Sequence, residues 1–227
     1  EKAWTQKRKE QIVKSRVLTT RLLYSKTTQL NLPISAFIAA SAVGIYGAQI
    51  SEKVFNEEDQ PFEDFMGNCC KQWENSVDKF EKTCRVVKLR LGVILDKNQG
   101  ALPKIANMVK NGIGSPLGDG QQFMPWIHIE DAVNIFFESI LNEKISGTFN
   151  TVSNDYITNS ELTKKIGKVF NKKLWLPNVP SFVLKFLYGE MSDTILKGVK
   201  VSNEKLKKIE LKLKYEKIED ALLEIYS

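Results

Sequence analysis

The sequence predicts an α/β protein with a buried parallel sheet and a smaller, mostly helical lobe at its carboxyl end. Two short apolar runs, at 34–41 and 86–95, have the composition of strands that are covered on both faces. Patterns with helical spacing at 4–24 and 62–80 flank the first run and predict helices that pack on the sheet. Beyond residue 152 helical patterns dominate, which predicts the second lobe.

The composition bounds the class of protein. The 227 residues are 42% hydrophobic, enough to bury one core or a core with a small appended lobe. No run reaches the roughly 18 to 20 apolar residues that a bilayer span needs, and no signal peptide precedes Glu1, so we predict a soluble, cytoplasmic protein without membrane contact. Cys69, Cys70 and Cys84 lack metal-binding spacing, so we expect reduced thiols and no metal site. The net charge of +6 comes mostly from lysines spread over helix surfaces, which does not favour a nucleic-acid partner.

The first half of the chain is expected to alternate helices and strands. The segment 4–24 has no glycine or proline and predicts a helix, the run 34–41 predicts a strand, and 52–60 predicts a polar connection. From residue 62 the apolar positions recur every three or four residues, which predicts one broad helical face. These positions are Phe65, Met66, Cys69, Cys70, Trp73, Val77 and Phe80.

The second half continues with a strand at 86–95 and a helix that begins near Pro103 and ends at Asn111-Gly112. Four glycines within 112–122 predict turns, because the alternative, a phosphate-binding loop, needs a strand before it and a helix that opens on its third glycine. The remaining expectations are a helix that opens at Asp131, a strand at 148–152, a helix after a capping box at 158–161, a helix pair at 182–198 and a charged tail ending in the apolar-patterned segment 218–225.

A turn after the first predicted strand is the most informative local feature. Ser41 ends the strand, and the glycines at 44 and 47 permit a sharp turn that presents its hydroxyl at the carboxyl end. Ligands of open α/β sheets collect at such ends. The alternative is an ordinary turn with a hydroxyl that caps it.

Short motifs recur along nearly the whole chain: Trp4-Thr5, Ser15-Arg16, Ser41 to Gly47, Trp73-Glu74, Arg90 to Val93, Gly118 to Gln122 with Trp126 to His128, and Gly189 to Met191. Their order and approximate spacing resemble the extended short-chain dehydrogenase/reductase superfamily, in its nucleotide-sugar epimerase branch and the "epimerase family protein" subgroup. Glu210 and Gln121 depart from that pattern, which usually has glycine and arginine there.

The resemblance implies the domain organisation. Residues 1–152 would form the carboxyl-terminal part of a Rossmann-like NAD(P)-binding domain with a substrate-side loop at 96–126, and 153–227 a small carboxyl-terminal domain. Family members begin with a glycine-rich turn that grips the cofactor pyrophosphate, and no such turn occurs here. We therefore expect roughly 70 further residues, two βαβ units, before Glu1.

The resemblance also implies the site. The family's catalytic tyrosine and lysine correspond to Met66 and Cys70, neither of which suits proton transfer. Tyr46 could act instead, or be structural; Arg90 could be an ion pair, Trp126 a core residue, and His128 a tie between strand and helix. The implied catalytic residues are Ser41 and Tyr46. The implied cofactor-facing residues are Ser41, Ala42, Arg90, Leu91, Gly92 and Val93. The implied substrate-side residues are Gln122, Trp126 and His128.

Two functions remain open on this reading. One is NADP-dependent epimerase or oxidoreductase chemistry, with NAD as the alternative cofactor and a small, sugar-derived molecule as the expected substrate. The other is a non-catalytic protein that binds NADP as a structural or redox-sensing ligand. Family members often pair through two long helices, so the helices at 4–24 and 62–82 are the candidates for a homodimer interface.

Overall fold

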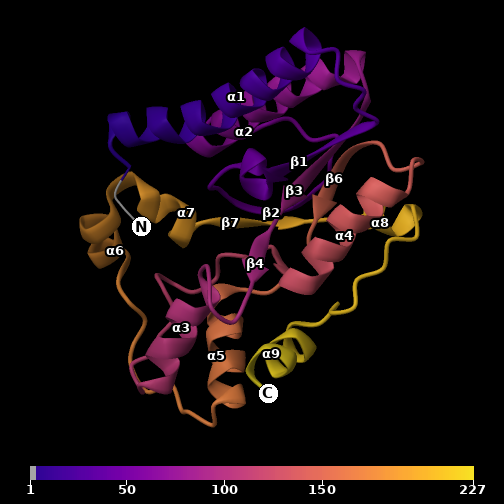
Figure 1. Cartoon of the computed structure of the whole chain (residues 1–227). Helices are drawn as coiled ribbons and strands as arrows, with labels where there is room; N and C mark the ends of the chain where they lie inside the picture. Colours follow the sequence, from indigo (N-terminus) through magenta and orange to yellow (C-terminus); the bar gives the residue numbers. More distant parts are fainter. Residues whose placement is uncertain (1–3) are drawn as a thin grey trace.

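A computed structural model describes residues 4–227, and residues 1–3 lie outside the description (Figure 1). Three short parallel sheets organise the chain: one in the order β1-β3-β6, one of β2 with β7, and one of β4 with β5. Among the described residues, β1 and β6 are therefore the edges of the central sheet. The strands are β1 (Ala36–Ala42), β2 (Ile50–Phe55), β3 (Arg85–Leu91), β4 (Val93–Leu95), β5 (Trp126–His128), β6 (Gly147–Thr151) and β7 (Gly198–Val201).

Helices cover both faces of the central sheet, and strand alternation decides which side chain meets which helix. Phe37, Ala39 and Val86 pack with Val77 and Phe80 on the face that α1 and α2 cover. Residues of the opposite parity, such as Val87 and Leu89, pack on the side of α4. The helices are α1 (Gln6–Gln29), α2 (Phe65–Val77), α3 (Leu102–Lys110), α4 (Ile129–Leu141), α5 (Asn159–Val169), α6 (Ser181–Tyr188), α7 (Asp193–Leu196), α8 (Glu204–Lys208) and α9 (Ile218–Tyr226).

Helix starts follow the expected capping chemistry. The Thr5 hydroxyl caps α1, and the Asp64 carboxylate caps α2 through the backbone N–H of Gly67 at 2.7 Å. The predicted capping box is confirmed, because Thr158 and Glu161 satisfy each other's backbone N–H groups at the start of α5. The predicted long helix from residue 62 is shorter: α2 ends at Val77, and a 3₁₀ segment, Asp78–Lys82, follows.

The expected single strand at 86–95 is instead two strands in different sheets. β3 ends at Leu91, and after Gly92 the chain pairs as β4 with β5. A Cβ atom at Gly92 would lie 2.7 Å from the Pro125 carbonyl oxygen and 2.9 Å from a Val152 methyl. Only glycine fits where the chain changes sheets, because two other segments approach its backbone closely.

The sequence predicts only a polar connection at 52–60, but the structure places a strand at its start. Residues 50–55 form β2, which pairs in parallel with β7 from the far end of the chain (Figure 1). β2 exposes most of its residues, so its composition carries no signal of burial. The pairing is decided by a partner about 150 residues away in sequence, which local patterns do not reveal.

The helix expected from Asp131 begins two residues earlier, at Ile129, with His128 as its N-cap. Its buried face is formed by Ala132, Ile135 and Ser139. Four of its apolar side chains are exposed: Val133, Phe137, Ile140 and Leu141. The tail helix at 218–225 is confirmed as α9, and the 182–198 pair as α6 and α7.

The largest buried cluster contains residues of both predicted lobes. Leu95, Leu102 and Trp126 pack in it with Leu162 of α5 and Leu222 of α9. In Figure 1, α3, α5 and α9 lie together below the sheets. The boundary at 152/153 stays a prediction. In the described part of the chain no helix is both long and apolar enough to cross a bilayer.

Candidate functional site

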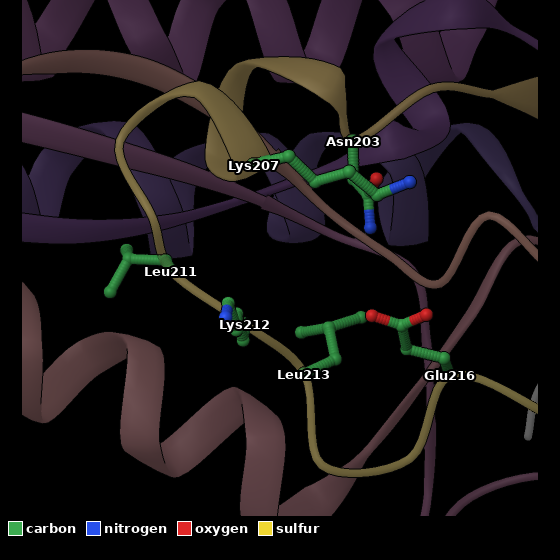
Figure 2. A pocket seen from close by; sticks show the side chains of 6 residues that line it. All are labelled: Asn203, Lys207, Leu211, Lys212, Leu213 and Glu216. Carbon is green, nitrogen blue, oxygen red and sulfur yellow. The ribbon is translucent and has the colours of Figure 1, made fainter.

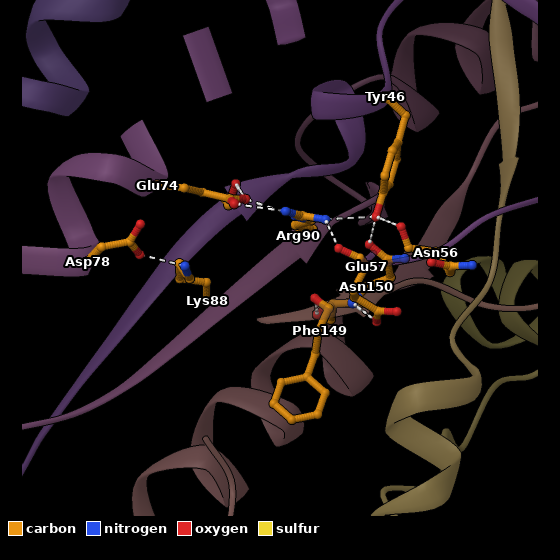
Figure 3. A network of polar contacts seen from close by, with 11 residues as sticks. Tyr46, Asn56, Glu57, Glu74, Asp78, Lys88, Arg90, Phe149 and Asn150 are labelled. Atoms are coloured by element: carbon orange, nitrogen blue, oxygen red, sulfur yellow. Dashed lines mark hydrogen bonds and ion pairs between the residues drawn. The ribbon is translucent and has the colours of Figure 1, made fainter. Parts of the chain in front are cut away.

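A row of polar side chains crosses the central sheet near the carboxyl ends of its strands. In the strand register Ser41 lies opposite Arg90, and Arg90 opposite Asn150. Residues paired in this way point to the same face, here the face covered by α2. All three side chains are buried, so the row must satisfy its hydrogen bonds within the protein (Figure 3).

Glu74 of α2 joins two members of the row. Its carboxylate accepts from Arg90 Nε and Nη2, both at 2.9 Å, and from the Ser41 hydroxyl at 2.6 Å. The guanidinium and the carboxylate thus form a two-point ion pair with both side chains 8% exposed. Burial disfavours the charge on Arg90, but the hydrogen bonds and charge of Glu74 outweigh it and raise the pKa of Arg90.

Tyr46 closes the row on the other side of Arg90. Its hydroxyl accepts from Arg90 Nη1 at 2.9 Å and lies 2.7 Å from Asn150 Oδ1 and 2.9 Å from the Asn56 carbonyl oxygen. Burial raises the pKa of Tyr46 to about 12, against the lowering effect of Arg90 and Asn150. A phenol that is fully buried and holds its proton this tightly is a poor acid or base near neutral pH.

The turn that carries Tyr46 has the form expected from its glycines. Residues Val43–Tyr46 form a 3₁₀ segment, and Gly47 follows with φ of 76°, a conformation that favours glycine. A Cβ atom there would lie 2.3 Å from the Phe62 ring, so a side chain does not fit. The turn places Tyr46 at the carboxyl ends of the strands, as the sequence indicated.

Glu57 completes the network from the loop after β2. Its carboxylate accepts the backbone N–H of Asn150 at 2.7 Å, and its carbonyl oxygen accepts from Arg90 Nη1 at 3.3 Å. The loop therefore covers the open edge of β6 at the level of the polar row. We refer to Ser41, Tyr46, Glu57, Glu74, Arg90 and Asn150 as the polar row network.

The positions assigned to the family's tyrosine and lysine lie beside the glycine turn. A Cβ atom at Gly44 would lie 2.7 Å from Met66 Cε and 3.8 Å from Cys70 Sγ. Burial, with Cys69 and Glu74 nearby, raises the pKa of the Cys70 thiol to about 12. A thioether and a buried neutral thiol thus face the turn where a proton-transfer pair would be needed.

The remaining cofactor-facing candidates lie at the crossing of two sheets. Ala42 and Leu91 are register partners at the ends of β1 and β3, and the Val93 N–H donates to the Pro125 carbonyl oxygen at 2.7 Å. The Pro125 carbonyl oxygen lies close to the backbone of Gly92. A hollow of about 260 Å³ lies beside β1, toward α1. It is lined by Ser15, Arg16, Thr19, Thr20, Phe37, Ala39, Ala40 and Trp73.

The three substrate-side candidates each contact a residue of the predicted carboxyl-terminal domain, namely Ile195, Asp155 or Glu224. Gln122 Nε2 donates to the Leu117 and Ile195 carbonyl oxygens at 3.0 and 2.9 Å. Trp126 is a core residue whose indole N–H donates to the Asp155 carbonyl oxygen at 3.1 Å. The three candidates are near one another in sequence but contact different partners. Their roles toward a substrate stay predictions.

His128 ties β5 to α4, the structural alternative considered above. Its Nδ1 accepts the Glu130 backbone N–H at 3.2 Å, which leaves Nε2 to donate to Glu224 at 2.9 Å. The Tyr215 ring packs against the imidazole at a tilt of 44°, with 4.1 Å between the ring centroids. Asp131 accepts the N–H groups of Lys214 and Tyr215, so this corner also anchors the carboxyl-terminal segment.

Three members of the polar row network were not predicted as site residues from the sequence: Glu57, Glu74 and Asn150. Glu74 entered only as part of the motif Trp73-Glu74. Glu74 interrupts an apolar helical face, which is a usable signal, because a carboxylate at such a position needs a buried cation. Glu57 and Asn150 carry no comparable signal. Their roles depend on strand register and on where a loop folds back.

The family model that matches is described as a domain of unknown function, DUF1731, and covers residues 179–225. The chain is 35% identical over 225 residues to the chloroplastic epimerase family protein SDR39U1 homolog of Arabidopsis thaliana, covering 96% of this chain and 63% of that protein. It is 34% identical over 224 residues to epimerase family protein YfhF of Bacillus subtilis, covering 98% and 73%. The chain thus spans less than two thirds of the length of the Arabidopsis relative.

The structure resembles that of human epimerase family protein SDR39U1 (isoform 2), solved with NADPH. The TM-score is 0.92 at 27% identity, covering 99% of this chain and 76% of the human one. The fold and these comparisons together place the chain among the α/β proteins of the extended short-chain dehydrogenase/reductase class, with a Rossmann-like parallel sheet. Within that class, the chain belongs to the epimerase family proteins represented by YfhF and the SDR39U1 homologs.

Proposed function

We propose that this chain forms the nicotinamide-side and substrate-side parts of an NAD(P)-dependent, epimerase-like protein. The observation that carries the proposal is the likeness of nearly the whole chain to a protein solved with NADPH. NADP is the proposed cofactor, with NAD as the alternative. The carboxyl ends of β1 and β3 are the proposed contact, since α/β sheets bind ligands at that edge.

The described residues fit one end of a dinucleotide and not its phosphates. Within 4–227 no glycine turn leads from a strand directly into an α-helix N-terminus, the arrangement that holds a pyrophosphate. The turn at Gly44–Gly47 is itself a 3₁₀ segment that is followed by β2, and the Gly118–Gly120 turn is closed by backbone hydrogen bonds to Val179 and Leu117. The hollow beside β1, at about 260 Å³, is smaller than most pockets that take a drug-sized ligand.

The proposed roles follow the polar row network. NADP, when bound, would supply redox chemistry. Ser41 and Tyr46 stay the proposed catalytic residues, with Ala42 and Arg90 to Val93 beside the nicotinamide and Gln122, Trp126 and His128 on the substrate side. Glu74 and Arg90 would orient both hydroxyl groups, because each hydroxyl has one of them as a hydrogen-bond partner.

A second candidate, a non-catalytic protein that binds NADP as a structural or redox-sensing ligand, has its own support. Met66 does not titrate, and the pKa values of Cys70 and Tyr46 are both raised to about 12. The described side chains nearest the turn therefore offer no group that exchanges protons readily near neutral pH.

One experiment separates these candidates. The full-length protein is titrated with NADPH by fluorescence. Turnover is then followed in two ways: as NADPH oxidation over a panel of carbonyl compounds, and as conversion of nucleotide sugars to their epimers by chromatography, because epimerisation consumes no net NADPH. Turnover that falls at least about tenfold in Ser41→Ala, with NADPH affinity retained, supports catalysis. Tight NADPH binding without turnover on any compound supports the second candidate. Failure of the full-length protein to bind NADPH or NADH would refute both.

We also propose a substrate class, a compartment and a dimer interface. The substrate would be a small molecule derived from a sugar, and the compartment would be the cytoplasm. A homodimer would form through the helices at 4–24 and 62–82. In its support, α1 exposes Leu18, Leu22 and Leu23 next to α2. Sedimentation of wild type and Leu22→Glu tests the interface, and a monomeric wild type would refute it.

A further inference from the structure

Two helix ends meet at one end of the molecule and form a protruding surface. α3 and α5 pack side by side, and the segment that leaves α5 passes the end of α3 on its way to α6 (Figure 1). The Trp175 indole N–H donates to the Gly112 carbonyl oxygen at 2.9 Å, which joins the two segments. A Cβ atom at Gly112 would meet nothing within 4 Å, so the backbone faces open solvent there. We refer to the surface formed by residues 107–113 and 168–176 as the tip.

The tip exposes large apolar side chains. Trp175 is 72% exposed, and Met108 and Ile113 are exposed as well. The three are neighbours, because the Ile113 N–H donates to the Met108 carbonyl oxygen at 3.0 Å and Trp175 is bonded to Gly112. Single exposed apolar residues are normal, but a cluster of them among polar residues is typical of a surface that contacts another body.

The charges on the tip have one sign. The segments 97–118 and 162–178 contain no aspartate or glutamate. Lys168, Lys172 and Lys173 are exposed, and none of them forms an ion pair with an acidic residue of the described chain. The tip is therefore complementary in charge to an anionic partner.

The polar groups beside the exposed rings are already paired. The backbone N–H groups of Asn111 and Gly112 donate to carbonyl oxygens of α3, and those of Asn171 and Lys172 to carbonyl oxygens of α5, at 2.8–3.1 Å. The indole N–H of Trp175 is paired too. The apolar side chains can thus enter a less polar medium without stripping water from these N–H groups.

We propose that the tip is a peripheral contact with an anionic lipid surface. Trp175 and Ile113 enter the boundary between headgroups and acyl chains, and the lysines contact the anionic headgroups. A lipid surface deforms around a protrusion, whereas a protein partner would need a groove that matches it. The sequence predicts no membrane contact because no apolar run can span a bilayer, but contact through a surface needs no such run.

Lysines of α8 provide the matched control. Lys207 pairs with Glu204 at 3.2 Å, and Glu216 lies across the adjacent pocket of about 230 Å³ (Figure 2). That surface therefore carries charges of both signs. The variant Lys207→Gln/Lys208→Gln removes two positive charges, as a double substitution at the tip does, but leaves the tip intact.

The test is co-sedimentation of the full-length protein with vesicles of phosphatidylcholine, either pure or with about a third phosphatidylserine. Wild type should bind the anionic vesicles at least about tenfold more tightly than the neutral ones, and raised salt should weaken this binding. Lys172→Gln/Lys173→Gln should bind at least about tenfold more weakly, because each lysine near an anionic surface contributes about fivefold. The α8 control variant should bind as wild type.

Fluorescence tests whether the exposed ring enters the bilayer. Of the four tryptophans, Trp126 is buried and Trp4 and Trp73 are half-buried, so bromine-labelled acyl chains should quench mainly Trp175. The quenching should disappear in Trp175→Phe. This variant keeps an apolar ring, so its affinity for the vesicles should stay within about threefold of wild type.

Three results would overturn the proposal. One is no binding to anionic vesicles up to about 1 mM lipid, where even a single acyl anchor binds. Another is an equal loss of affinity in the tip variant and the α8 control variant, which would indicate an effect of net charge alone. The third is tighter binding to duplex DNA than to vesicles, without quenching by the labelled lipid. The substituted side chains are exposed, so thermal unfolding of each variant should match wild type.

Discussion

At the scale of single residues, the polar row network exchanges solvation for internal hydrogen bonds. Glu74 and Arg90 form a buried ion pair, and the burial of each charge is tolerated only because the opposite charge is present. The hydroxyls of Ser41 and Tyr46 attach to opposite ends of this pair. The network therefore fixes the geometry of the turn, and losing any one member leaves its partners unpaired.

Removing one member of the ion pair should destabilise strongly. Arg90→Met and Glu74→Leu should each lower the free energy of unfolding by about 3–5 kcal/mol, because each leaves a buried, uncompensated charge. The double variant should recover part of the loss. Urea unfolding measures all three, and a double variant as unstable as the sum of the single ones would show that the two residues do not act as a pair.

The raised pKa of Tyr46 should appear as a loss of stability at high pH. The phenol ionises near pH 10 in the unfolded chain and at about 12 in the folded one, so stability is unaffected below pH 10 and falls between the two values. The difference in the free energy of unfolding between wild type and Tyr46→Phe should therefore shift against wild type by about 1.4 kcal/mol between about pH 9 and pH 11. Urea unfolding at both pH values measures it.

Tyr226→Phe is the comparison for this prediction. The pKa of Tyr226 is also raised to about 12, but its ring lies nearer the surface. The change with pH in the difference in unfolding free energy between wild type and Tyr226→Phe should therefore be smaller. A constant difference between wild type and Tyr46→Phe across this range would show that Tyr46 titrates normally.

At the scale of elements, the site depends on how closely α2 approaches the glycine turn. Gly67, in the first turn of α2, faces the Phe62 carbonyl oxygen, and a Cβ atom there would lie 2.0 Å from it. The Ile45 carbonyl oxygen, which accepts the Phe62 N–H at 2.9 Å, would be 3.1 Å away. The position of Glu74 over the sheet therefore depends on a helix start that admits no side chain at residue 67.

Gly67→Ala should destabilise the protein although alanine is the better helix former. The clash is with backbone, which cannot rotate away, so we expect a loss of about 1–3 kcal/mol. Asn75→Ala is the matched control: it is exposed in the same helix and should be neutral or slightly stabilising. Thermal unfolding compares the two, and a Gly67→Ala variant as stable as Asn75→Ala would contradict the close approach.

At the scale of the whole molecule, the two predicted lobes share one core. The cluster around Leu102 and Trp126 includes Leu162 of α5 and Leu222 of α9, and α9 is the last element of the chain. β7 also returns from the second lobe to pair with β2. With this much shared surface, the described chain should unfold as a unit.

Leu222→Ala should therefore shift one cooperative transition rather than split it. Its fully buried side chain predicts a loss of about 2–5 kcal/mol, whereas the adjacent Leu223, 58% exposed, should lose little on the same change. Calorimetry and near-ultraviolet circular dichroism should report the same midpoint for each variant. Two separate transitions in Leu222→Ala would support independent folding of the second lobe.

Local chemistry was enough to predict many of the elements. The apolar runs predicted β1 and β3, the capping box predicted α5, and the spacing of apolar residues predicted α2, because each signal lies within one turn or one strand. The glycine turn was also predicted from the sequence. The resemblance assigned Met66 and Cys70 to the family's tyrosine and lysine positions, but their contact with the turn, and the partners of Ser41 and Arg90, came only from the structure.

The sequence by itself determined the class of fold, the order of most elements and the turn that carries Tyr46, since propensity, capping and periodicity act over a few residues. Only the tertiary structure decided that Ser41, Arg90 and Asn150 form one row under Glu74, that β2 pairs with β7, and that Trp175 lies beside the end of α3. Strand register and the return of distant segments set these contacts. They are properties of the packed chain, because segments of similar local preference can pair in several registers until the whole core selects one.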